Sequence, residues 1–120
     1  MPHPNHEIEI ELIGRRYTLK PSFEVIAAIE AATGKGAFAL GSRLVNGEAG
    51  IAELATILYQ ALKRQGGPRY EAIGEALVER GAEPFLGPLA NLLLTAFRGH
   101  RETADLAAGQ PAEASGDPLP

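Results

Sequence analysis

Histidines and serines are the first residues to consider for chemistry, because imidazole binds metals and transfers protons near neutral pH. His3, His6 and His100 all lie outside the segments that have the pattern of folded elements. His3 and His6 could form a metal site, but their proline-rich surroundings also fit a solvated lead-in. None of the three serines has a histidine near it in an expected element, so no serine triad is predicted.

Six of the 15 acidic residues fall on two regular faces, at every second residue from 7 to 11 and every fourth residue from 71 to 79. Paired carboxylates can serve acid and base catalysis, but these spacings also describe solvated faces of a strand and a helix. Glu30 differs, because it shares a helical stripe with Phe23 and Ile26. It either has a structural or capping role or marks a contact with a partner.

The segment Gly34-Lys35-Gly36 invites comparison with a phosphate-binding loop. Such a loop needs a glycine five residues before the Gly-Lys pair and a Ser or Thr after it, and these positions hold Ile29 and Gly36. The glycines fit the end of a helix better. Since the chain has no cysteine either, we expect no enzyme activity, no cofactor and no metal site.

The net charge of the chain argues against nucleic acid as a partner. The chain has 120 residues, a formal net charge of −4 and a pI near 5.3, whereas binding to nucleic acid depends on a basic surface. No run approaches the roughly 20 apolar residues that span a bilayer, and the first residues lack the pattern of a secretion signal. We expect a cytoplasmic protein that binds neither nucleic acid nor membrane.

Alternating apolar residues from 7 to 20 predict a β-hairpin. Gly14-Arg15 suits a two-residue type II′ turn, because glycine tolerates positive φ at the first position. This turn predicts Leu12 opposite Tyr17, with the remaining pairs in step: Ile13–Arg16, Ile10–Leu19, Glu11–Thr18 and Glu9–Lys20.

Helical periodicity follows, interrupted by Gly, Pro and Asn. Ser22 is placed to cap the first helix, and Tyr70, Ile73, Leu77 and Val78 are predicted to point inward from the fourth. We expect an α+β fold, mainly α, with the hairpin packed on a bundle of about five helices. The helices are predicted at about 22–33, 37–45, 51–65, 69–80 and 85–98. Residues 7–99 would form one globular domain, 1–6 a flexible lead-in and 100–120 a disordered tail.

The fifth helix is apolar around most of its circumference, with Asn91 and Thr95 its only polar residues between Phe85 and Phe97. It is either the central helix, surrounded by the other four and the hairpin, or in part a groove or oligomer contact. These two roles are compatible. The candidate protein-interface residues are Phe85, Leu86, Leu89, Leu92, Leu93, Phe97 and Glu30.

Three stretches together resemble a known family: "GRRYTLKPSFEVIAAIE", "LGSRLVNGEAGIAELATILYQALKRQGG" and "IGEALVERG" before the apolar helix. They resemble the gene transfer agent family of phage-type tail proteins, across about residues 7 to 99. The resemblance is one of strands, helices and spacings rather than of a catalytic motif.

The resemblance implies a role in building a phage-like tail in the bacterial cytoplasm, in a gene transfer agent or prophage. One implied role is a tail assembly chaperone, which coats the helical tape measure protein until tube subunits polymerise around it. The alternative is a structural component of the tail, in the tube or as a minor tail protein. Tube subunits are usually β-rich, so the scarcity of strand favours the chaperone. Tape measure protein, other tail proteins and further copies of this chain are the implied partners.

Overall fold

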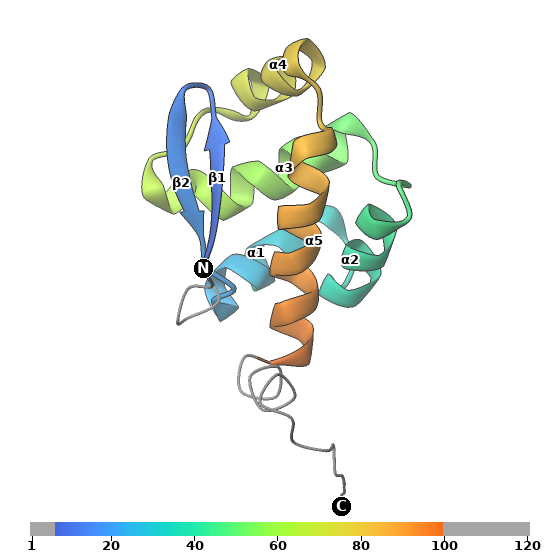
Figure 1. Cartoon of the computed structure of the whole chain (residues 1–120). Helices are drawn as coiled ribbons and strands as arrows, with labels where there is room; N and C mark the ends of the chain where they lie inside the picture. Colours follow the sequence, from blue (N-terminus) through green and yellow to red (C-terminus); the bar gives the residue numbers. More distant parts are fainter. Residues whose placement is uncertain (1–6, 100–120) are drawn as a thin grey trace, which may run out of the picture.

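The computed structural model describes residues 7–99. In this range two strands precede five α-helices and one short 3₁₀ helix (Figure 1). The expectations for residues 1–6 and 100–120 lie outside the described residues. The elements are β1 (Ile8–Leu12), β2 (Arg15–Leu19), α1 (Phe23–Thr33), α2 (Ala37–Val45), α3 (Ile51–Leu62), η1 (Lys63–Gln65), α4 (Tyr70–Arg80) and α5 (Glu83–Arg98).

The hairpin forms as expected, but its predicted register is wrong by two residues. Leu12 pairs with Arg15, and the turn is Ile13-Gly14, with φ of 50° and 71°. Positive φ at both turn residues defines a type I′ turn, in which glycine takes the second place instead of the first. The remaining pairs are Ile8–Leu19, Glu9–Thr18, Ile10–Tyr17 and Glu11–Arg16.

The observed register gives Ile8 and Glu11 better matched partners than the predicted one, while Leu12 exchanges Tyr17 for Arg15. Ile8 gains Leu19 as its partner, where the predicted register would have set it opposite Pro21. Charges also match, because Glu11 faces Arg16 and Lys20 Nζ lies 3.3 Å from Glu7 Oε2. A shift of two residues keeps every side chain on its face, so the apolar face still points to the core.

The hairpin lies over α3 and α5, where its buried face completes the core (Figure 1). Side chains of η1 stabilise the hairpin through contacts at β2. Gln65 Nε2 donates to the Thr18 carbonyl oxygen at 2.6 Å, and Arg64 forms an ion pair with Glu24 of α1. The turn between α3 and α4 therefore connects the strand to the first helix.

Local signals set the ends of α1 as the sequence predicts. The backbone N–H of Val25 donates to Ser22 Oγ at 3.2 Å, which confirms Ser22 as the N-cap. Gly34 ends the helix in the left-handed region, with its N–H bonded to the Glu30 carbonyl. The glycines at 34 to 36 thus belong to a helix terminus rather than to a phosphate-binding loop.

Two helices share the centre of the fold. Helix α3 packs against α1, α4 and β2, while α5 packs mainly against α2, with further contacts to β1 and α1. Helix α5 is therefore not the single central helix that its composition suggested. The expected α+β, mainly α fold class is confirmed. Among residues 7–99, no helix combines the length and the apolar character needed to cross a membrane.

Candidate protein interface

Three of the candidate residues on α5 lie in the core. Leu89, Leu92 and Leu93 are each 0% exposed and belong to the main hydrophobic cluster. Their i, i+3 and i+4 spacing places them on one face of α5, and α5 packs mainly against α2. In the folded monomer these side chains offer no surface to a partner.

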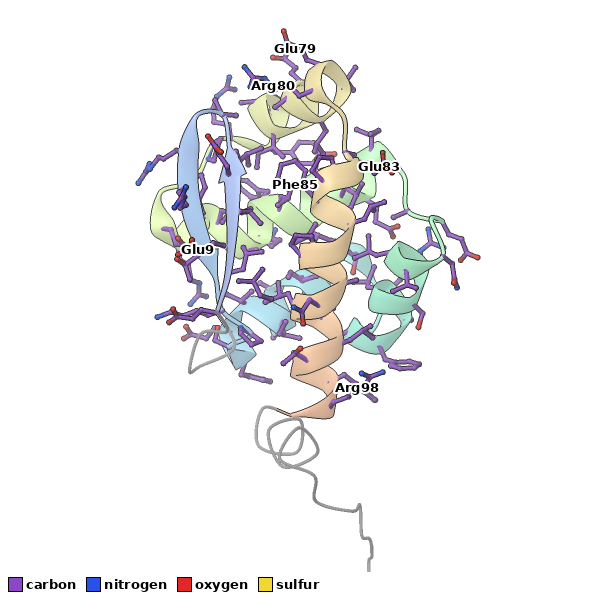
Figure 2. All side chains as sticks on the ribbon, viewed as in Figure 1. Glu9, Glu79, Arg80, Glu83, Phe85 and Arg98 are labelled. Carbon is purple, nitrogen blue, oxygen red and sulfur yellow. The ribbon has the colours of Figure 1, made fainter. Side chains whose placement is uncertain are left out.

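The other α5 candidates lie at the two ends of the helix. Phe85 and Leu86 are partly buried and pack against the core, and Figure 2 shows Phe85 on the hairpin side of α5. Phe97, in the last turn, is 64% exposed, and its ring lies 5.1 Å from that of Phe38 on α2. Of the six apolar candidates, Phe97 therefore offers the most surface to another molecule.

Glu30 acts as a cap on the next helix. Its Oε2 accepts the backbone N–H of Ala37 at 2.8 Å, and Ala37 is the first residue of α2. The N-cap position itself, Gly36, has no side chain to do this. The contacts thus support the structural role of Glu30 that the sequence left open beside a partner contact.

An apolar groove between α3 and α4 is the feature that the sequence did not predict. It has a volume of about 790 Å³. Val78 was predicted to point inward, and this prediction is wrong, because Val78 lies at the groove and is 73% exposed. The same prediction is wrong for Tyr70, which is 38% exposed there, and Ile51 is exposed beside it. The groove is lined by Ile51, Ala52, Ala55, Tyr70, Glu71, Gly74, Glu75, Val78 and Glu79.

The charged side chains that line this groove are acidic, and one of them, Glu71, lies 3.5 Å from Arg69 Nη1. Glu71, Glu75 and Glu79 contribute its carboxylates, and no lysine or arginine is found among the described residues that line it. Figure 2 shows Glu79 on α4 at the end of the molecule opposite Arg98. An apolar surface with an acidic rim suits a partner that brings apolar side chains beside Lys or Arg.

The pKa of Glu53 on α3 is shifted. Burial would raise this pKa, but hydrogen bonds and charge interactions with Arg43 and Lys35 outweigh burial and hold the pKa of Glu53 below its ordinary value. Its Oε1 lies 3.0 Å from Arg43 Nη2, and its Oε2 lies 3.1 Å from Lys35 Nζ. The three residues connect α3 to α2 and to the turn before α2, which is a structural arrangement.

No cluster of three or more His, Asp or Glu side chains suited to a metal ion occurs within residues 7–99. The histidines considered above fall outside the described range. What the described residues present is a small α+β protein with an acidic, apolar groove and exposed aromatic side chains.

Comparison with known proteins gives the family. The sequence model of the family described as phage tail tube protein, GTA-gp10, matches residues 5–99. The chain therefore belongs to this family. Its class is that of phage-type tail proteins, as the resemblance to gene transfer agent tail proteins implied. No curated protein matches the chain, and no solved structure matches it.

Proposed function

We propose that this chain is a structural component of a phage-type tail, and that it acts through contacts with other tail proteins and with its own copies rather than by catalysis. The family match over residues 5–99 carries this proposal, because that family is described as a tail tube protein. Among the roles expected from the sequence, the description agrees more closely with a structural component than with a chaperone. The protein would fold in the bacterial cytoplasm and then enter the growing tail.

The surface of the described residues is consistent with such a role. Phe23, Phe38 and Phe97 are large apolar side chains left exposed on three different helices. Single exposed apolar residues are common on monomers, but a groove together with several such residues provides sites for neighbouring subunits. The α3/α4 groove adds an acidic rim, which would orient a neighbouring subunit as well as attract it.

Deletion of the gene in a strain that produces the particle tests the tail role. Electron microscopy of the particles should show heads without normal tails, and expression of the wild-type chain from a plasmid should restore the tails. Normal tails in the deletion strain would contradict any role in tail formation.

A tail assembly chaperone that binds the tape measure protein is the second candidate. The helical character of the fold favours it, because the only sheet among residues 7–99 has two short strands. Such a sheet gives little strand edge from which to close a ring of subunits. Co-expression of the chain with the tape measure protein encoded beside it tests this role. A soluble complex that co-purifies in constant ratio would support the chaperone, and insoluble tape measure protein without a complex would count against it.

A further inference from the structure

The hairpin turn has an unusual residue at its tip. Ile13 adopts a φ of 50°, a region in which β-branched residues are rare, because the side chain crowds the backbone there. Type I′ turns favour Asn, Asp or Gly at this position. Ile13 is also 49% exposed. The fold therefore keeps an apolar side chain at a strained and half-exposed position, and such outliers cluster at functional sites.

Two arginines follow directly on this tip. Arg15 and Arg16 are both exposed at the start of β2. Arg15 lies over the ring of Tyr17 at 5.0 Å, and Arg16 is 3.8 Å from Glu9. The hairpin turn thus presents one apolar side chain beside two arginines, of which Arg16 also lies near Glu9 and opposite Glu11. These are the properties that the acidic, apolar α3/α4 groove would accept.

Within one molecule the turn and the groove lie on different sides of α4. The turn adjoins Ala76 and Arg80, whereas Gly74 and Val78 line the groove. Glu75 and Glu79 border both regions, so an acidic ridge separates them. Figure 1 shows the turn reaching the end of the molecule where α4 lies. The turn therefore leaves the groove of its own chain open.

We propose that the hairpin turn of one copy docks into the α3/α4 groove of a second copy. Ile13 would enter beside Val78 and Tyr70, and the arginines would meet the carboxylates of the rim. The contact joins two different surfaces, so it leaves a free turn on one copy and a free groove on the other. Repetition of such a contact builds rings if the rotation closes and filaments if it does not.

Charge complementarity favours the hairpin turn of a second copy over residues 100–120 as the occupant of the groove. Residues 100–120 contain one arginine, Arg101, against four acidic residues, so their charge repels the acidic rim. The four are Glu102, Asp105, Glu113 and Asp117. The hairpin turn brings the opposite charge. The proposal deepens the suggested tail role, but its test uses the purified chain alone and so does not depend on particles.

Two variants test the two sides of the contact separately, one in the turn and one in the groove. Ile13→Asn removes the apolar anchor and creates the Asn-Gly sequence that type I′ turns prefer, so the hairpin should remain folded. Val78→Lys places a positive charge in the groove at an exposed helical position where it can pair with Glu75. Val45→Lys is the matched control, because Val45 is 66% exposed at the end of α2 and does not line the groove.

Sedimentation velocity over a concentration series, with circular dichroism to check folding, measures the contact. The wild-type chain should self-associate, more weakly at high salt, and each of the two variants should raise the dissociation constant by about tenfold or more. The Val45→Lys chain should behave as wild type. Mixing the Ile13→Asn and Val78→Lys chains should restore one intact contact and yield a one-to-one pair.

Two results would overturn the proposal. One is a wild-type chain that stays monomeric at every concentration. The other is association that the Ile13 and Val78 variants leave unchanged, or that the control weakens equally, because the copies would then meet through another surface. Neither result would bear on whether the chain belongs in the finished tail.

Discussion

Gly41 of α2 lies so close to Leu94 of α5 that a β-carbon at Gly41 would stand 2.6 Å from Leu94 Cδ2 and 3.6 Å from Leu93 Cβ. The two helices can approach this closely because Gly41 has no side chain. This contact helps to cover the apolar face of α5 that the sequence offered as a candidate interface.

Gly41→Ala should therefore lower the free energy of unfolding by about 1–2 kcal/mol, because Leu94 must shift to make room. Gly74→Ala is the matched control, since a β-carbon there would meet nothing within 4 Å, and it should raise the free energy of unfolding by about 0.5–1 kcal/mol through helix propensity. Urea unfolding of both variants measures the difference. Equal effects at the two glycines would contradict the close α2–α5 packing.

Leu93 and Phe97 should respond very differently to an acidic side chain. Leu93→Asp buries a charge in the core and should abolish folding, and even Leu93→Ala should cost about 2–5 kcal/mol. Phe97→Asp changes a residue that is mostly exposed and should leave the helical circular dichroism spectrum intact. A folded Leu93→Asp chain would contradict the burial of this face.

Glu30 should stabilise the start of α2 through its hydrogen bond to the Ala37 N–H. Glu30→Ala leaves this donor without its partner and should lower the free energy of unfolding by about 1 kcal/mol. Glu30→Gln keeps a carbonyl oxygen in the same place and should retain most of the stability. Thermal unfolding compares the two, and an equal loss in both would argue against the capping role.

The ion pairs of Glu53 should make stability depend on pH in the acid range. The pKa of Glu53 in the folded chain lies below its ordinary value of 4.5, so the unfolded chain takes up the proton first as the pH falls. The stabilisation is then complete above about pH 4.5 and is lost as the pH falls through the lower folded-state pKa.

Glu53→Gln tests this pH dependence. The variant should be less stable than wild type by about 1 kcal/mol at pH 7, and the gap should shrink as the pH falls below 4.5. Urea unfolding at a series of pH values measures both chains. A gap that stays constant from pH 7 to acid would contradict the sign of the pKa shift.

The sequence predicts which face of each element is apolar better than it predicts which element packs against that face. Alternation assigned the hairpin residues to the correct faces, but glycine is compatible with either position of a primed turn, so Gly14 alone could not fix the register. The apolar stripe of α4 includes Val78 because periodicity identifies a face without showing how far the neighbouring helix covers it.

The α3/α4 groove could not be predicted for the same reason. It is lined by small residues of two helices, Ala52 and Ala55 of α3 and Gly74 of α4, and how these helices pack is a tertiary property. The nearest signal in the sequence is the set of glutamates at every fourth residue on α4, but this spacing is equally typical of a solvated helix face. On α5, composition alone could not distinguish a core face from an interface, because both are apolar.

The most direct test of the proposed structural role is the amount of this chain in finished particles. Particles are purified by density gradient from a producing strain, and quantitative mass spectrometry gives the ratio of this chain to the other tail proteins. A structural component should remain in a fixed ratio after repeated purification and should be lost from particles that lack tails. A chain that is abundant in the lysate but absent from tailed particles would contradict the structural role and leave the chaperone role in its place.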